Sequence, residues 1–268
     1  MRQMLSISSY LAVKEVWRNR GRFLLVSLVI ALITLLVLFI AALGEGLGNG
    51  NREYISKLDA DLIVYQAKSD TVIAASRLGR NRLAAVRRVE GVADAGMLGT
   101  SSATLILPDG AEPLKVAMLG VEPGRTGEPK VAQGAQLSTD LAQEAIIDAN
   151  TAYRSNLQVG DTLTLRVTQG TRDEFYDLRI TGIASGQQFQ LQPSIFVPFY
   201  TWDRIRPKSE AEVNSSNPIA NVILVKLQDP TQVEAVRARL AAQVDNVETA
   251  TLTEAIQALP GYSAQQST

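Results

Sequence analysis

The side chains that most often carry out catalysis in proteins are missing from this sequence. Its 268 residues include no histidine and no cysteine. Their absence excludes serine–histidine–aspartate and cysteine–histidine nucleophile systems, together with the commonest kinds of zinc site. A serine–lysine pair would require Ser-x-x-Lys, and a nucleotide-binding P-loop would require Gly-x-x-x-x-Gly-Lys-Ser/Thr. Neither motif occurs in the chain.

Carboxylates gather in two places where a metal ion could in principle bind. Asp59 and Asp61 precede a short apolar run, and Asp173, Glu174 and Asp177 surround the tip of a predicted hairpin. Neither group has the glycine-bearing loop spacing of a calcium site. Acidic residues at turns are normally solvated. We therefore predict no catalytic, cofactor-binding or metal-binding residues in this chain.

One cluster of basic residues lies after residue 44, and two interpretations of it stay open. It consists of Arg77, Arg80, Arg82, Arg87 and Arg88. A run of this kind on a helix is usually a solvated face, and the alternative is contact with a partner or with lipid headgroups. The sequence alone does not decide between them.

The overall charge argues against nucleic acid as a partner. Five of the 26 basic residues but only one of the 27 acidic residues lie in the first 44 positions, so residues 45–268 carry a net charge of −5. Binding to phosphates requires a basic face. This 224-residue segment is long enough for one large domain or two small ones, and without cysteine it must be stabilised by an ordinary hydrophobic core.

The most extreme feature of the sequence is an apolar run that must be placed in a membrane. Residues 23–43 are 21 consecutive positions without a charge, and 16 of them are Leu, Ile, Val or Phe. As a helix the run is about 31 Å long, close to the ~30 Å hydrocarbon core of a bilayer. Sixteen such residues favour insertion by roughly 5–10 kcal/mol. We therefore predict a transmembrane helix over residues 23–44.

The flanks of this run set its orientation. Residues 1–22 contain five basic residues and one acidic residue, whereas the first charged residue after the run is Glu45 and the first basic one is Arg52. Because basic residues mark the cytoplasmic side, the N-terminus is predicted to be cytoplasmic and residues 45–268 extracytoplasmic. The alternative is a cleaved signal peptide, whose apolar region should be only about 7–15 residues long and end at a small-x-small site. The longer run and the poor site at residues 41–43 disfavour cleavage.

Two short segments flank the predicted span. Before it, Tyr10, Val13 and Trp17 follow helical spacing, which indicates either a helix lying in the cytoplasmic interface or a frayed tail. After it, every second residue from Gly44 to Gly50 is glycine. A nucleotide-binding loop needs a preceding strand and another glycine spacing, so we predict a flexible exit from the membrane.

Residues 45–268 read as alternating strands and helices. Strand patterns are predicted at 62–66, 103–107, 114–121, 145–148, 162–168, 175–184, 195–199, 221–227 and 247–251, and helices at 78–89, at 150–156 and from 229 to about 244. Pro108-Asp109-Gly110 is typical of a hairpin between two of these strands.

The order of these elements predicts an α+β fold with an insertion. Two βα units, at about residues 51–125 and 218–260, flank a strand-rich stretch at about 126–217. Paired units of this kind form a split βαβ, ferredoxin-like domain into which the middle is inserted as a β-rich subdomain. We therefore predict a single N-terminal transmembrane helix followed by an extracytoplasmic domain of this class.

Several local patterns resemble one family of membrane proteins. The basic lead-in at residues 16–22, the single span and the split α+β domain resemble the MacB/FtsX-like permeases of ABC transporters. The β-rich stretch adds the series Ala145-Ile-Ile-Asp148, a helical turn, Leu157-Gln-Val-Gly160-Asp161, and a later proline-containing strand, Ser194-Ile-Phe-Val-Pro198. This series resembles the family's MacB-like periplasmic core domain.

The resemblance implies a function and a set of partners. Such permeases work as dimers with two separate ABC ATPase subunits on the cytoplasmic side of the plasma (inner) membrane, and they pass ATP-driven motion to the outer domain for export or mechanotransmission. An extracytoplasmic adaptor and membrane lipid are further implied partners. No cofactor of the chain's own and no enzymatic activity are expected. Family permeases continue with three more membrane helices that are absent before Thr268, so the chain is expected to be the N-terminal part of a permease.

A second function class stays open from the sequence. The chain could be a single-span, membrane-anchored binding or scaffold module that recruits an envelope partner without ATP. A sensor is a weaker third option, because only 22 residues precede the span and an output domain needs more. The sequence does not identify a substrate, an oligomeric state, or whether the exterior is a periplasm.

Overall fold

The computed structural model describes residues 17–208, 212 and 217–259, and the chain divides into two compact units, Met1–Leu47 and Gly48–Thr268. In the first unit, helix α2 (Arg20–Ser56) begins, and residues Arg20–Ala42 form a 23-residue stretch long and apolar enough to cross a membrane. None of this stretch is buried by other parts of the protein. The predicted N-terminal apolar helix is confirmed, and the interfacial helix predicted before it falls largely outside the described residues.

Helix α2 is longer than predicted. It continues through the glycines of residues 44–50 to Ser56, so the prediction of a flexible exit is wrong. Each glycine disfavours a helix by about 1 kcal/mol relative to alanine, but helix propagation is cooperative and packing outweighs propensity. At the end of α2, Tyr54 and Ile55 are buried in the second unit, with 1% and 3% of their surface exposed. Burial of this last turn explains why the helix persists.

The second unit is built mainly from strands. The strands are β1 (Leu62–Gln66), β2 (Leu78–Gly79), β3 (Val92–Ile106), β4 (Leu114–Val121), β5 (Val131–Gly134), β6 (Glu144–Asp148), β7 (Thr162–Gln169), β8 (Arg172–Ala184), β9 (Ser194–Pro198), β10 (Ile219–Ala220), β11 (Val222–Leu227) and β12 (Val247–Thr251). The helices are α3 (Arg80–Val86), α4 (Ala149–Ser155), α5 (Phe199–Ile205), α7 (Val233–Gln243) and α8 (Leu252–Gln257), with 3-10 turns η1 (Ile73–Ala75), η2 (Pro108–Gly110) and η3 (Pro230–Gln232).

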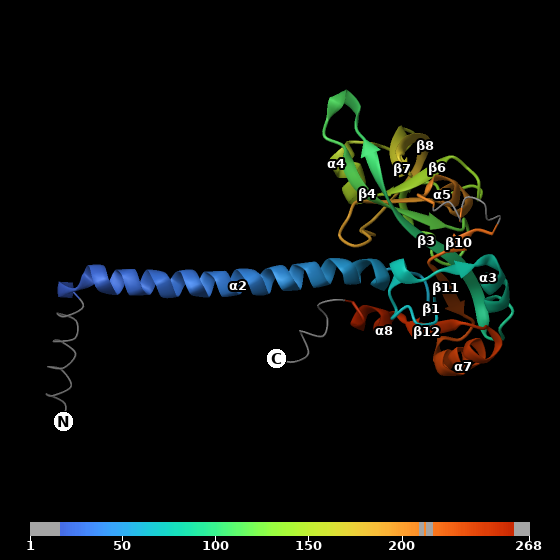
Figure 1. Cartoon of the computed structure of the whole chain (residues 1–268), viewed down its shortest axis with the longest axis horizontal. Helices are drawn as coiled ribbons and strands as arrows, with labels where there is room; N and C mark the ends of the chain where they lie inside the picture. Colours follow the sequence, from blue (N-terminus) through green and yellow to red (C-terminus); the bar gives the residue numbers. More distant parts are fainter. Residues whose placement is uncertain (1–16, 209–211, 213–216, 260–268) are drawn as a thin grey trace. The chain divides into compact units, whose positions relative to one another are not determined.

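One part of this unit has the predicted ferredoxin-like topology. Its strand order is β12-β1-β11-β3 and every neighbouring pair is antiparallel. Helix α3 connects β1 to β3, and α7 connects β11 to β12, so the chain follows the order βαβ twice. We call these strands with α3, α7 and α8 the ferredoxin-like part (Figure 1). The predicted α+β class is confirmed.

Both faces of this sheet are covered, which explains its apolar first strand. Leu62 and Val64 pack in one core with the helical stripes of α3 and α7, and Ile63 and Tyr65 pack in a second core with Tyr54 at the end of α2. Strands buried on both faces lose the alternation of apolar and polar residues. The predicted buried strand at residues 62–66 is therefore confirmed.

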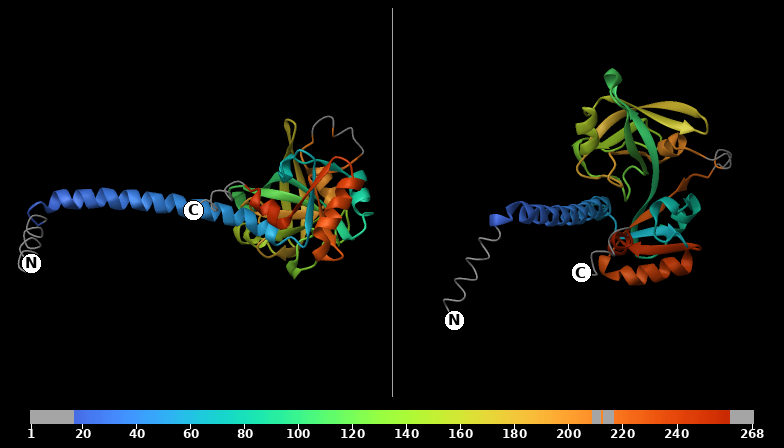
Figure 2. Two further views of the ribbon diagram at one scale, coloured as in Figure 1. Left: turned by 90° about the horizontal axis from the view of Figure 1, so that it is seen from below. Right: turned by 60° about the vertical axis from the view of Figure 1, so that its left-hand side comes forward.

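The other part of the unit is a closed ring of strands. The pairings β3–β4, β4–β9, β9–β6, β6–β8, β8–β7 and β7–β3 return to their starting strand. Closure leaves few free edges, which is how antiparallel folds avoid edge-to-edge association. We call this ring with α4, α5 and β5 the β-rich part; Figure 2 shows it joined to the ferredoxin-like part through β3. The ring includes β4 and the second half of β3, which precede residue 126 in the sequence. The domain boundaries at residues 126 and 217 stay a prediction.

Some predicted elements differ in extent. The helix predicted at 78–89 is only Arg80–Val86, because Leu78 and Gly79 pair with Ala220 and Ile219 in a separate two-stranded sheet. The strand predicted at 103–107 is the end of the fifteen-residue β3. The sequence patterns also missed α5 and α8, whereas the hairpin through Pro108-Asp109-Gly110 is confirmed by the antiparallel pairing of β3 with β4.

Candidate functional site

The acidic residues at the β7–β8 hairpin accept side-chain hydrogen bonds, those of Asp173 and Asp177 across the two strands and that of Glu174 within β8. Thr168 Oγ1 donates to Asp173 Oδ1 at 2.7 Å, and Thr164 Oγ1 donates to Asp177 Oδ1 at 2.6 Å. The phenol of Tyr176 donates to Glu174. Cross-strand pairs of this kind stabilise a hairpin. These carboxylates therefore support the register of β7 and β8, and they do not converge on a common point.

The other acidic pair stabilises a lysine on a neighbouring strand. Lys226 Nζ lies 2.8 Å from Asp59 Oδ1 and 3.7 Å from Asp61 Oδ1. The hydrogen bond and charge of Lys226 lower the pKa of the Asp59 carboxyl. Asp61 also accepts the backbone N–H of Leu227 at 2.8 Å. Among the described residues, no group of three His, Cys, Asp or Glu side chains could hold a metal ion.

The arginine cluster divides between internal contacts and solvent. The Arg87 guanidinium bonds the Ala95 carbonyl oxygen at 2.6 and 2.9 Å and Glu122 at 2.8 Å. Arg77 bonds the carbonyl oxygens of Ala74 and Ser76. In the same cluster, Arg80 lies over the Tyr200 ring, Arg82 is 3.9 Å from Asp245, and Arg88 is exposed. Arg77 and Arg87 are therefore held by acceptors of the protein itself.

The structure instead reveals a site at the junction of the two parts, centred on Trp202 of α5. The indole is 2% exposed and packs over Gly99 of β3 and Gly120 of β4, which are direct partners across the sheet. A Cβ atom built on Gly99 would approach Trp202 to 2.3 Å, and one on Gly120 to 2.5 Å. Ordinary carbon–carbon contact is about 3.5–4.0 Å. Only glycine at both positions therefore admits the indole.

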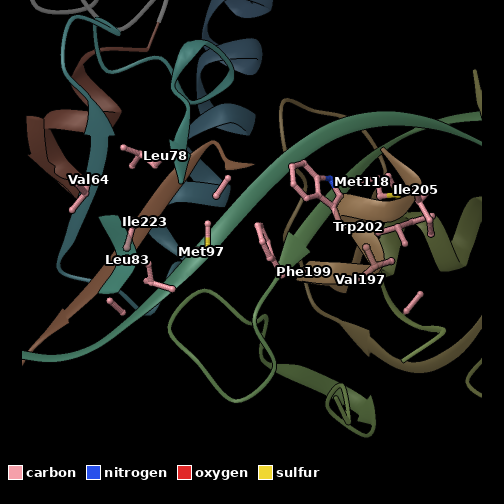
Figure 3. Close-up of a cluster of buried hydrophobic side chains, with 14 of the residues drawn as sticks. Val64, Leu78, Leu83, Met97, Met118, Val197, Phe199, Trp202, Ile205 and Ile223 are labelled. Atoms are coloured by element: carbon pink, nitrogen blue, oxygen red, sulfur yellow. The ribbon is translucent and has the colours of Figure 1, made fainter. Parts of the chain in front are cut away.

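Polar contacts fix the orientation of this indole. Its Nε1 donates to Ser101 Oγ at 2.9 Å, and the guanidinium of Arg206 lies 5.1 Å from the ring centroid. Arg206 also bonds Asp203 at 3.0 Å and Glu212 at 3.2 Å, with only 11% of its side chain exposed. Cation–π contacts and partly buried ion pairs of this kind fix geometry. In Figure 3, Trp202 lies with Phe199, Ile205 and other apolar side chains.

A small polar cavity of about 170 Å³ adjoins the junction. Its lining includes Arg77, Ser101, Trp202 and Arg206, and both arginines already bond acceptors of the protein. Of the other lining groups, the Ser101 hydroxyl accepts the Trp202 N–H and Glu212 pairs with Arg206. These contacts hold elements of the two parts of the domain together.

A second cavity, of about 290 Å³, lies where α2 ends in the second unit. Its walls come from five separate segments: the end of α2, Tyr65 of β1, the loop around η1, residues 189–191 and the end of α8. Among the described residues, the lining contains no Asp, Glu, Lys or Arg. Sequence reasoning missed both this cavity and the junction. For the junction a signal existed, since Met-Leu-Gly occurs at residues 97–99 and again at 118–120, and glycine inside a strand marks close approach of another element.

Comparison with known proteins is consistent with this architecture. The periplasmic region of MacB from Actinobacillus actinomycetemcomitans aligns with a TM-score of 0.51 and 13% identity, over 76% of this chain and 95% of that one. The extracellular domain of the noncanonic ABC-type transporter YknZ from Gram-positive bacteria aligns with a TM-score of 0.49 and 12% identity, over 70% of this chain and 98% of that one. At such low identity, the MacB likeness shows a shared fold.

The family itself is shown by the sequence. Residues 23–243 match the profile of the MacB-like periplasmic core domain, a match that begins in the apolar run and extends to the end of α7. The matched region covers nearly all of the candidate span, all of the β-rich part and most of the ferredoxin-like part, of which β12 and α8 lie beyond residue 243. The chain belongs to the MacB-like periplasmic core domain family.

Proposed function

We propose that the chain is a permease subunit, or the N-terminal part of one, of a MacB/FtsX-type ABC transporter. In this role it couples ATP hydrolysis in the cytoplasm to motion of its extracytoplasmic domain, for export or for mechanotransmission. The observation that carries the proposal is the family match, which takes in the apolar helix and the outer domain as one continuous region, residues 23–243.

The packing of the last turn of α2 supports coupling between this helix and the outer domain. The last turn of α2 is buried, and the Tyr54 ring lies 5.2 Å from the Phe189 ring and 6.5 Å from the Phe196 ring. Phe196 belongs to β9 of the β-rich part, while Tyr54 packs in the same core as Tyr65 of the ferredoxin-like part. A displacement of the helix end is therefore felt directly by both parts, because packed cores transmit strain.

The proposal includes a topology and partners. The five basic residues before the span keep the N-terminus in the cytoplasm of a plasma (inner) membrane, and residues 45–268 lie outside it. These 268 residues contain no P-loop, and in our proposal the ATPase is a separate subunit. Two permeases form a dimer, membrane lipid surrounds α2, and an extracytoplasmic adaptor can contact the outer domain. The chain itself is not an enzyme and needs no cofactor, and nucleic acid is not a partner.

Affinity purification tests this function. The intact gene product is tagged at its outer domain, solubilised from native membranes in mild detergent and purified, and the bound proteins are identified by mass spectrometry. An ABC ATPase should be recovered in stoichiometric amount. A matched sample with an unrelated single-span protein, tagged in the same way, should recover none. Absence of any ATPase from the first sample contradicts the proposal.

A second candidate function rests on a specific observation. In the part of the chain that the structure describes, α2 is the single helix able to span a membrane. A single-span anchored binding or scaffold module would have this feature and would need no ATPase. The same purification distinguishes the two, because a scaffold would retain envelope partners and no nucleotide-hydrolysing subunit.

A further inference from the structure

The cavity at the end of α2 is lined mostly by apolar side chains. Tyr54 and Ile55 of α2, Tyr65 of β1, Phe189 and the end of α8 enclose about 290 Å³. This is near the lower end of the ~300–1,000 Å³ typical of small-molecule sites. The described residues of the lining carry no charged side chain. The cavity therefore has the volume and the apolar lining to hold one narrow apolar group.

Two residues of the cavity lining are apolar and exposed. Val72 and Leu191 both line the cavity, and 49% and 38% of their surfaces are exposed. They come from two different loops. Isolated exposed apolar residues need no explanation, but two that line the same apolar cavity are typical of a binding site.

The backbone of both loops is held in an unfavourable conformation. Thr71 has φ of 56°, Gln190 of 51° and Leu191 of 60°, and each of these residues lines the cavity. Left-handed backbone is unfavourable for a residue with a Cβ atom. Strain of this kind concentrates at ligand-binding sites, where the surrounding structure maintains it. The intrinsic backbone preferences of these residues therefore do not explain the conformation of the two loops.

The position of the cavity along the chain indicates the source of its occupant. Tyr54 is twelve residues beyond Ala42, the last residue of the candidate span. Tyr54 and Ile55 of the cavity wall belong to α2, the same helix that contains the candidate span. If α2 crosses a membrane, the nearest reservoir of long apolar groups is the bilayer.

We propose that this cavity binds one acyl chain of a membrane lipid. The chain would enter between Val72 and Leu191 and lie against the rings of Tyr54, Tyr65 and Phe189. The proposal requires that α2 spans the membrane, but it does not require the ATPase or transport. It therefore goes beyond the function proposed above and can fail or succeed independently of it.

Photolabelling of the full chain tests the site. The protein is reconstituted in lipid nanodiscs that contain a trace of phosphatidylcholine with a diazirine at the end of one acyl chain, and labelled peptides are identified by mass spectrometry. Label is expected on residues that line the cavity as well as on the apolar part of α2. Label on α2 serves as the internal standard, because that segment contacts lipid whether or not the cavity does.

Two neighbouring alanines provide a matched pair of variants. Ala74 lines the cavity and Ala75 does not, although both belong to η1 and both are exposed. Ala74→Trp should reduce cavity labelling to about a tenth relative to the α2 standard, because the indole occupies the space of the chain. Ala75→Trp should leave it unchanged. Thermal unfolding of both variants checks that the domain is folded.

Three outcomes would overturn the proposal. Label confined to residues 23–42 of α2 would show that lipid does not enter the cavity. Equal cavity labelling in Ala74→Trp and Ala75→Trp would place the lipid elsewhere on the surface. Cross-linking of a photoreactive amino acid at position 72 to a second copy or another protein, with no lipid adduct, would assign the cavity to a protein partner.

Discussion

The packing of Trp202 against two paired glycines yields a prediction that distinguishes the two glycines. A methyl group on Gly99 would meet Cη2 and Cζ3 of Trp202 at 2.3 Å and Cε3 at 2.6 Å, which are atoms of the six-membered ring. A methyl group on Gly120 would meet Cγ at 2.5 Å, Cβ at 2.6 Å and Cδ2 at 2.7 Å. Leucine at position 202 would remove the first set of atoms but keep Cβ and Cγ.

The magnitudes follow from the burial of this site. Since Trp202 is 2% exposed, it cannot move aside without disturbing the core, and Gly99→Ala and Gly120→Ala should each lower the free energy of unfolding by about 1–3 kcal/mol. Trp202→Leu alone should cost less than the ~3–5 kcal/mol typical of Trp→Ala. In the Trp202→Leu background, Gly99→Ala should cost less than ~0.5 kcal/mol, whereas Gly120→Ala should stay destabilising by ~1 kcal/mol or more.

The assay is denaturant unfolding of the full chain in detergent, followed by far-UV circular dichroism. This probe is suited to the comparison because fluorescence would change with Trp202 itself. Gly21→Ala is the control, since nothing lies within 4 Å of a Cβ atom at that position. Equal costs of Gly99→Ala in the wild-type and Trp202→Leu backgrounds would refute the packing argument, and so would rescue of Gly120→Ala to the same extent as Gly99→Ala.

Three further predictions concern buried polar groups and orientation. Burial raises the pKa of the Asp148 carboxyl, whose Oδ2 has no partner among the described residues. The stability of the domain should therefore fall as the pH rises from the ordinary carboxyl pKa of ~3.9 through the raised pKa of Asp148. Asp148→Asn, which keeps the cap to Thr151, should raise the melting temperature at pH 7 but not at pH 3. The Tyr54 hydroxyl is also buried without a partner in the described region, so Tyr54→Phe should be neutral or stabilising by ~1 kcal/mol in the same unfolding assay, and a loss above ~1 kcal/mol would contradict this. Replacing Arg18, Arg20 and Arg22 with Glu should disturb or invert the topology, and unchanged protease accessibility of the outer domain would count against the proposed orientation.

The sequence predicts best those elements whose signal is local. Strand β1 and the buried stripe Val236, Leu240 and Val244 of α7 lie where periodicity places them, because each is fixed by burial of its own side chains. Helix α8 could also have been predicted, since Thr251 and Glu254 form a capping box at its start.

Other features depend on contacts between distant segments. The first half of β3 contains Asp94, Gly96 and Gly99, residue types that disfavour strands, and their presence is explained only by partners elsewhere. Asp94 accepts bonds from Thr126, and Gly99 makes room for Trp202. The apolar cavity brings together five segments between residues 54 and 259, so no local pattern could have predicted it.

The central claim is that this chain works with a separate ATPase. The most direct measurement is the ATP hydrolysis rate of the co-purified complex in nanodiscs, compared with the same complex carrying Gly99→Ala and Gly120→Ala together at the strand junction. The account predicts that an ABC ATPase co-purifies with the intact gene product and that its rate changes when the outer domain is loosened. Recovery of no ATPase under conditions that preserve the membrane complex would contradict the account.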